Sequence, residues 1–349
     1  MSAMTMTRQQ PTTDAAQSPA ATERLTLARA INRGLRAAME ADPSVMLMGE
    51  DIGALGGVFR VTDGLLDDFG DSRVVDTPLA ESGIVGTAIG LALRGYRPVC
   101  EIQFDGFVFP AFDQITTQLA KMHYRSRGRL TLPVVIRIPY GGGIGAVEHH
   151  SESPEVLFAH TAGLRVVTPA TAADAFTMIQ EAIASPDPVI FFEPKGRYWD
   201  KGDVPVGRPY GSTAGGLDTA QVVRAGTDLT LVAYGPTVAT ALKAAETAAA
   251  EGTSIEVVDL RAISPLDTAT VAESVRRTGR CVVVHEAPVL YGAGAEVAAR
   301  ITEACFYHLS APVLRVGGFH TPYPVARVEH DYLPSVDRVL DAVDRAIAF

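Results

Sequence analysis

Cysteine, tryptophan and basic charge are scarce in this sequence. The 349 residues include 3 cysteines and 1 tryptophan. Cys100, Cys281 and Cys305 are far apart and form no C-x-x-C pair, so neither a zinc site nor a redox dithiol is indicated. Asp and Glu outnumber Lys and Arg by 40 to 30, for a formal net charge of −10. Nucleic-acid-binding proteins usually carry a basic face, and this balance argues against that class.

Long apolar runs and export signals are lacking as well. No run reaches the ~18 residues that a membrane-spanning helix needs. Residues 1–22 are mostly polar and rich in Thr, Gln and Pro, without the apolar core of a signal peptide, and we expect them to form a disordered tail. The cysteines stand in apolar segments, where we expect reduced core residues. These features favour a cytoplasmic protein without a membrane span.

Several catalytic motifs are also absent. The sequence has no P-loop, no G-x-S-x-G and no H-E-x-x-H, which argues against P-loop NTPases, serine hydrolases of that type and zinc proteases. The glycine-rich stretch GGGIGA at 141–146 lacks the G-x-G-x-x-G register. A nicotinamide-dependent enzyme is therefore a weakly supported alternative.

Helical and strand patterns alternate along most of the chain. The expected strands, such as VMLMG, PVCEIQF and PVIFFEP, are apolar throughout, which is typical of a parallel sheet covered on both faces. We predict an α/β fold of two doubly wound domains, 23–200 and 226–349, joined by a linker at 201–225. Ligands of such sheets lie beyond the carboxyl ends of the strands. The loops GEDIGALGG, TPLAES, QFDGF and PYGGGIGAVEHHSES are thus the candidate site.

Two features of these loops suggest proton chemistry. Glu81 in TPLAESGIVG heads a run that is otherwise apolar or small, and a buried, unpaired carboxylate is costly. It needs a partner, a proton or a chemical role, unless it only favours the start of a helix. His149 and His150 follow the glycine-rich loop. They are either solvated loop residues or proton donors, since histidine titrates near neutrality.

The ordered motifs of the chain resemble a known family, the beta subunits of the thiamine-diphosphate-dependent 2-oxo acid dehydrogenases. The resemblance spans about residues 24–349 and rests on GEDIGALGGVFR, TPLAESGIVG, EIQFDGFVFPAFDQI, HHSESPE, VIFFEPK, VVDLRAISPLD, VVHEAP and TPYP. It implies a transketolase-like pyrimidine-binding domain followed by a transketolase C-terminal-like domain. Details such as HHSESPE, VIFFEPK and HEAP resemble the branched-chain members most.

The resemblance also implies roles for individual residues. Glu81 would hydrogen-bond N1′ of the cofactor's aminopyrimidine and favour its 4′-imino form. Phe107 would stack on the pyrimidine, and Leu79 would pack beside the same ring. His150 would move a proton when the acyl group passes to a lipoyl arm. Some members hold a monovalent cation such as potassium, and Asp187 is the only side chain here expected near it.

The G-D-G motif that anchors a magnesium-bound diphosphate is broken in this chain. The two candidates are Gly70-Asp71-Ser72 and Gly202-Asp203-Val204, and neither has glycine at the third position. By resemblance, an alpha subunit then holds magnesium and the diphosphate of thiamine diphosphate in an α2β2 heterotetramer, which serves a lipoyl acyltransferase core. The expected activity is oxidative decarboxylation of branched-chain 2-oxo acids such as 3-methyl-2-oxobutanoate. A pyruvate or acetoin dehydrogenase beta subunit and a non-catalytic docking subunit are the alternatives.

Overall fold

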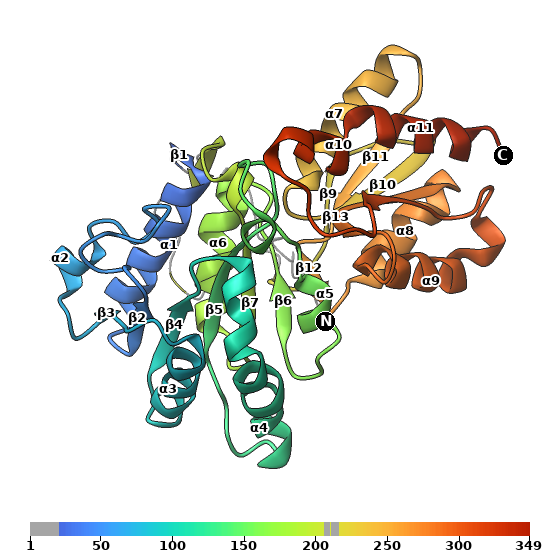
Figure 1. The fold of residues 1–349 in the computed structure, drawn as a ribbon. Helices are drawn as coiled ribbons and strands as arrows, with labels where there is room; N and C mark the ends of the chain where they lie inside the picture. The colour runs from blue at the N-terminus through green and yellow to red at the C-terminus, as the bar shows by residue number, and fades with distance from the viewer. Residues whose placement is uncertain (1–20, 206–209, 211–215) are drawn as a thin grey trace, which may run out of the picture.

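The computed structural model describes residues 21–205, 210 and 216–349. The tail expected over 1–22 lies outside this range except for its last two residues, and strand β1 begins at Thr22. Figure 1 shows two α/β units, one built by the N-terminal half of the chain and one by the C-terminal half. The predicted α/β class with two doubly wound units is confirmed.

The first unit is built on a seven-stranded sheet with the order β12-β6-β7-β5-β4-β2-β3. Every neighbouring pair is parallel except β12 with β6. The strands are β2 (Val45–Gly49), β3 (Val74–Asp76), β4 (Arg97–Glu101), β5 (Val135–Tyr140), β6 (Arg165–Val167), β7 (Val189–Pro194) and β12 (Ala262–Ser264).

Both faces of this sheet are buried, because successive strand residues enter different cores. Val135 packs into the core formed with α1 and α6, and Ile136 packs into the core formed with α3 and α4. Uniformly apolar strands are therefore required, as the sequence pattern predicts. The helices of this unit are α1 (Leu27–Ala41), α2 (Leu65–Phe69), α3 (Glu81–Leu93), α4 (Ala120–Arg125), α5 (Glu155–Ala159) and α6 (Ala172–Ala184).

The second unit has a five-stranded sheet with the order β14-β13-β10-β11-β9, parallel except at β9. Helices α7 and α11 cover one face, and α8 and α9 cover the other. The elements are β9 (Gln221–Arg224), β10 (Leu229–Ala233), α7 (Thr237–Ala250), β11 (Ile255–Asp259), α8 (Thr268–Thr278), β13 (Cys281–Pro288), α9 (Ala293–Cys305), β14 (Leu314–Gly318), α10 (Glu329–Tyr332) and α11 (Val336–Ile347).

The two units are joined by strands as well as by the connecting chain. β8 (Lys201–Pro205), in the stretch expected as a linker, pairs antiparallel with β1 (Thr22–Thr26). β9, at the other end of that stretch, belongs to the second sheet, and β12 returns from the C-terminal half to the edge of the first sheet. One apolar core also contains residues of both units, for example Ile136 and Val283. The hydrophobic core beneath the candidate site is therefore shared by both units.

A continuous helix runs from 112 to 125 after β4. It contains a π-helical turn, η2 (Gln114–Leu119), and ends in α4. A 3₁₀ segment, η1 (Asp105–Ala111), which contains Pro110, precedes it. This arrangement presents η1 beside the carboxyl end of β4.

Two further expectations concern the cysteines and membrane-spanning helices. The three cysteines are free and buried, as expected of core residues. Among the described residues no helix is long and apolar enough to cross a membrane.

Candidate functional site

Three loops meet at one edge of the first sheet. They follow β2, β4 and β5, which are neighbouring parallel strands, so their carboxyl ends lie together. Glu50 comes directly after β2, η1 follows β4, and residues 141–154 follow β5. Helix α3, which Glu81 begins, packs against η1. The loops that the sequence predicts as the candidate site therefore lie together at the carboxyl edge of the first sheet.

Glu81 is buried at the start of α3, with 8% of its surface exposed. Glu50 lies beside it, is 7% exposed and accepts a hydrogen bond from the backbone N–H of Ala80. Burial, and then the charges of Glu81 and Asp51, raise the pKa of Glu50 above its usual value. Its Oε1 atom is buried without a hydrogen-bond partner. Two buried carboxyl groups thus lie next to each other at this edge of the sheet.

Sequence reasoning named Glu81 but missed Glu50. The signal was present, because Glu50 opens the nominated loop GEDIGALGG immediately after a strand that is buried along its whole length. A carboxylate in that position lies at the carboxyl edge of the sheet, where ligands bind.

His150 lies among aromatic rings. Its ring centroid is 4.0 Å from that of Phe104, 5.1 Å from that of Phe107 and 4.3 Å from that of His149. Burial, and then the charge of His149, lower the pKa of His150, so the imidazole is neutral at neutral pH. Its Nδ1 atom is buried without a partner. The structure thus brings Phe107 and His150 together, and it adds Phe104, which the sequence reading did not single out.

A buried ion pair ties η1 to the histidine loop. Lys195 donates to Asp105 across 2.7 Å, and neither side chain is exposed. The other oxygen of Asp105 accepts from the backbone N–H of Glu152 at 2.9 Å. Asp105, in η1, therefore connects the 3₁₀ turn η4 (Lys195–Arg197), directly after β7, with the loop that carries His150. A buried charge is tolerated only when it is paired in this way.

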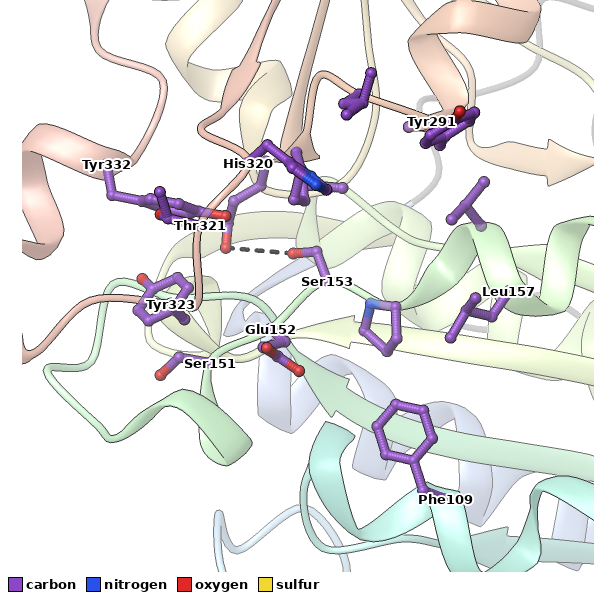
Figure 2. A pocket seen from close by; sticks show the side chains of 17 residues that line it. Phe109, Ser151, Glu152, Ser153, Leu157, Tyr291, His320, Thr321, Tyr323 and Tyr332 are labelled. Atoms are coloured by element: carbon purple, nitrogen blue, oxygen red, sulfur yellow. Dashed lines mark hydrogen bonds between the residues drawn. The ribbon is translucent and has the colours of Figure 1, made fainter.

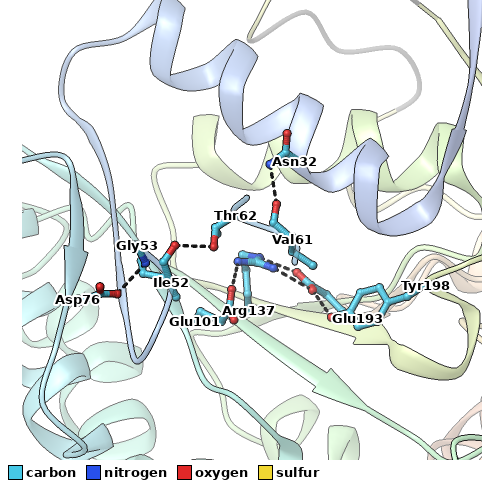
Figure 3. Close-up of polar contacts among 10 residues, drawn as sticks. All are labelled: Asn32, Ile52, Gly53, Val61, Thr62, Asp76, Glu101, Arg137, Glu193 and Tyr198. Carbon is cyan, nitrogen blue, oxygen red and sulfur yellow. Dashed lines mark hydrogen bonds and ion pairs between the residues drawn. The ribbon is translucent and has the colours of Figure 1, made fainter. Parts of the chain in front are cut away.

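The glycine-rich loop after β2 is anchored by side chains from three directions (Figure 3). Asp76 accepts from the N–H of Gly53 at 2.6 Å. Thr62 donates to the carbonyl of Ile52 at 2.7 Å. Asn32, on α1, donates to the carbonyl of Val61 at 2.7 Å. These bonds fix the path of the loop that begins at Glu50.

A buried charge network lies under that loop (Figure 3). The guanidinium of Arg137 donates to Glu193 at 2.6 and 3.0 Å and to Glu101 at 2.6 Å. Tyr198 also donates to Glu193. Gly57 has φ +78°, and a Cβ there would lie 3.0 Å from Glu101 Oε1. The network thus fixes the floor of the loop and leaves no space for a side chain at position 57.

The remaining predicted residues are Leu79 and Asp187. Leu79 is 79% exposed and stands two residues before Glu81, so it lies beside the site. Asp187 lies before β7, and its carboxylate is 3.5 Å from the guanidinium of Arg165. No group of three or more His, Cys, Asp or Glu side chains suited to a metal ion occurs in the part of the chain that the structure describes.

Comparison with known proteins agrees with this architecture. The family described as transketolase, pyrimidine binding domain matches residues 23–200, and the family described as transketolase, C-terminal domain matches residues 218–339. A solved structure, a split-gene transketolase described as an inactive beta4 tetramer, aligns with a TM-score of 0.74. It is 24% identical and covers 93% of this chain and 98% of that chain, so it supports the fold alone.

Curated relatives are similar over nearly their whole length. The pyruvate dehydrogenase E1 component subunit beta of Leifsonia xyli is 62% identical, over 93% of this chain and 95% of the relative. The 3-methyl-2-oxobutanoate dehydrogenase subunit beta of Mycobacterium tuberculosis is 55% identical, over 93% of each chain. With both domain families in place and these identities, the chain belongs to the beta subunits of the 2-oxo acid dehydrogenase E1 components.

Proposed function

We propose that this chain supplies the pyrimidine half of a thiamine-diphosphate site for oxidative decarboxylation of a 2-oxo acid, with acyl transfer to a lipoyl group. The observation that carries the proposal is the buried pair Glu81 and Glu50 at the head of α3, on the sheet edge that also presents Phe107 and His150. The cofactor, when bound, supplies a carbon nucleophile and an electron sink for decarboxylation.

The residues of the site suit the aminopyrimidine end of that cofactor. A carboxyl group can hydrogen-bond a ring nitrogen, Phe107 offers an aromatic face, and Glu50 Oε1 and His150 Nδ1 are buried polar atoms without partners. Lys195, a buried cation whose charge acts on His150, is already paired with Asp105. The arrangement therefore fits the pyrimidine and offers no free cation for the diphosphate among the residues described above.

Each residue has a defined task in this proposal. Glu81 would hydrogen-bond the pyrimidine nitrogen through its carboxyl group. Glu50, whose pKa is raised by burial, would lie beside that contact. Neutral His150 accepts or returns a proton at the reacting end of the site during acyl transfer. Phe107 orients the ring, and Leu79 packs beside it.

Because this chain lacks the diphosphate-binding motif, we propose that a second subunit supplies it. An alpha subunit would hold the diphosphate and magnesium in an α2β2 heterotetramer, and a lipoyl acyltransferase core would take the acyl group. The broken G-D-G stretches support this division of labour. We propose a cytoplasmic location. A monovalent cation near Asp187 would compete with Arg165, 3.5 Å from the same carboxylate.

Reconstitution tests this function. The purified chain, a candidate alpha subunit and their co-expressed complex would each be titrated with thiamine diphosphate and assayed for release of carbon dioxide from 2-oxo acids. We expect binding and turnover in the complex, and neither in the chain alone. Turnover by the chain alone would contradict the shared site. A complex that binds no thiamine diphosphate would contradict the function itself.

The substrate we propose is a branched-chain 2-oxo acid such as 3-methyl-2-oxobutanoate. Support comes from the motif details HHSESPE, VIFFEPK and HEAP, and from the 55% identical Mycobacterium tuberculosis relative whose name carries this substrate. Pyruvate is the second candidate, because the 62% identical Leifsonia xyli relative is named for it. One methylene in an apolar pocket changes the transition-state free energy by only ~1–3 kcal/mol, so some turnover of both is expected.

The two candidates differ in a measurable ratio. On the reconstituted complex, kcat/KM for 3-methyl-2-oxobutanoate should exceed that for pyruvate by about 10- to 200-fold. A value for pyruvate equal to or above the branched-chain value would assign the chain to the pyruvate enzymes. That result would leave the roles of Glu81 and His150 unchanged.

A further inference from the structure

The loop that carries His150 begins with a glycine-rich stretch whose only side chain beyond hydrogen is that of Ile144. Residues 141–145 read GGGIG, and Gly141, Gly143 and Gly145 have φ of +79°, +89° and +68°. The N–H of Gly141 donates to the carbonyl of Glu152 at 2.9 Å, which closes the base of the loop. Gly142 is buried, so its N–H needs an acceptor, whereas Gly143 and Gly145 are exposed and gain order from any acceptor that binds their N–H groups.

Those acceptors are two carboxylates of the second unit. Glu329, at the start of α10, accepts from the N–H of Gly143 at 2.9 Å and from the N–H of Gly145 at 3.0 Å. Glu286, near the end of β13, accepts from the N–H of Gly142. Successive backbone N–H groups in glycine-rich turns form concave anion sites, and here protein carboxylates occupy that site.

Tyr323 completes the arrangement. Its hydroxyl donates to Glu329 Oε1 at 2.8 Å, and both residues are largely buried, at 7% and 9% exposed. A Cβ built on Gly142 would lie 1.7 Å from that hydroxyl, so only glycine fits against it. Both oxygens of Glu329 are thus engaged, one by the N–H of Gly145 and the other by Tyr323 and the N–H of Gly143.

Glu286 and Tyr323, which take part in these contacts, line a cavity between the units (Figure 2). Its volume is about 300 Å³, and its lining includes Ser151, Ser153, Glu286, Tyr323 and Tyr332. In Figure 2 the serines of the histidine loop lie on one side and Tyr332, with Thr321 and His320, on the other. Residues 151–154 of the loop therefore border the cavity, while the glycines at its start are bound by the carboxylates.

His150 has no hydrogen bond at its buried Nδ1 to hold its ring. Its placement depends on the backbone of the loop and on packing against Phe104 and Phe107. We infer that Glu329 is a positioning residue for the acyl-transfer step: from the second unit it binds two N–H groups of the glycine loop and thereby fixes where His150 stands. This inference rests on the proposed function for the role of His150, while the contact itself does not.

The first test is amide hydrogen exchange on the full chain in complex with its alpha subunit. Glu329→Gln replaces one acceptor oxygen by an NH₂ group, so at least one loop N–H loses its partner. Exchange across 142–150 should quicken by about tenfold or more, as the loss of a hydrogen bond to a charged group implies. Glu303→Gln on the exposed face of α9 is the matched control. Unchanged exchange in Glu329→Gln would overturn the inference.

The second test is a double-mutant cycle on acyl transfer to a lipoyl domain. Glu329→Gln should slow acyl transfer in the wild-type background and add little in a His150→Ala background, because both act on one group. An equal loss in both backgrounds, or no loss in the wild-type background, would overturn the inference. Tyr323→Phe, which removes only one hydrogen bond to Glu329, should give a smaller effect of the same kind.

The two tests separate the inference from the function on which it rests. If His150→Ala by itself left acyl transfer unchanged, the role proposed for His150 would be wrong. Faster exchange in Glu329→Gln would then still establish the contact, and the positioning role in acyl transfer would be overturned together with that of His150.

Discussion

At the scale of single residues, the chemistry of this chain depends on where carboxyl groups lose contact with water. Glu50 and Glu81 lie side by side at the end of β2 and the start of α3, both nearly buried. A buried carboxyl group favours its protonated form, and a neighbouring carboxylate strengthens that preference. Glu81 therefore lies next to a carboxyl group whose pKa is raised above its usual value.

Replacement of Glu81 by Gln tests that role. An amide cannot deliver a proton, and loss of positioned acid–base chemistry commonly costs ~10²–10⁴ in rate. We expect decarboxylation by the reconstituted complex to fall by that factor, measured as single-turnover rates. Glu303→Gln should keep its activity, and thermal unfolding should show that both variants are folded. Wild-type turnover in Glu81→Gln would remove Glu81 from the mechanism.

Glu155 is a buried carboxyl group that the mechanism does not use. Its Oε1 accepts from the hydroxyl of Tyr234 at 2.6 Å, and its Oε2 is buried without a hydrogen-bond partner. Burial raises the pKa of Glu155 from 4.5 to about 7. A raised folded-state pKa means that Glu155 stabilises the fold below pH 4.5 and loses that contribution as the pH rises to about 7.

Glu155→Gln should therefore become more stable relative to the wild type as the pH rises. Between pH 5 and pH 8 we expect the difference in free energy of unfolding to shift by about 3 kcal/mol in favour of the variant. Urea unfolding at a series of pH values measures it. A constant difference across this range would show that Glu155 is ionised in the folded chain.

At the scale of secondary-structure elements, close helix packing shapes the unit that carries the site. Helices α1 and α6 cover the same face of the first sheet, and Gly34 lies at their contact. A Cβ at that position would lie 2.4 Å from Ile179 Cγ2 and 2.9 Å from the carbonyl oxygen of Phe176. The helices can approach this closely only because position 34 has no side chain.

Gly34→Ala should destabilise the chain by about 1–3 kcal/mol, the usual cost of overpacking a filled core. Gly90→Ala is the matched control, because Gly90 is exposed within α3 and nothing lies within 4 Å of its added Cβ. There alanine should stabilise the helix by about 0.5–1 kcal/mol. Urea midpoints of the isolated chain measure both. Equal effects of the two substitutions would contradict the packing argument.

At the scale of the whole molecule, the two units depend on each other. Strand β12 and one shared apolar core connect them, and Glu286 and Glu329 of the second unit bind the glycine loop of the first. Separation would expose apolar surface and leave the edge of β6 unpaired. Both changes favour unfolding or association.

A chain that ends at residue 205 should therefore be less stable than the full chain, although it contains Glu81, Phe107 and His150. We expect a lower urea midpoint and a strong tendency to aggregate, measured by circular dichroism and light scattering. A soluble fragment that unfolds at the midpoint of the full chain would show that the first unit folds independently.

The sequence determined the local features of this protein by itself. Apolar strands between amphipathic helices predicted parallel sheets, because strands buried on both faces need apolar residues throughout. The placement of Glu81 and His150 in loops after strands followed from the same pattern, since the carboxyl ends of parallel strands meet.

Only the tertiary structure decided the contacts between segments far apart in the chain. The pairing of β12 with β6, the ion pair of Asp105 with Lys195, and the binding of the glycine loop by Glu329 join residues about 90 to 190 positions apart. No local pattern encodes such partners, because burial and hydrogen-bond satisfaction are met only when the whole chain has folded. The contact of Glu50 with Glu81 belongs with them, since only folding brings these two carboxyl groups together and buries them.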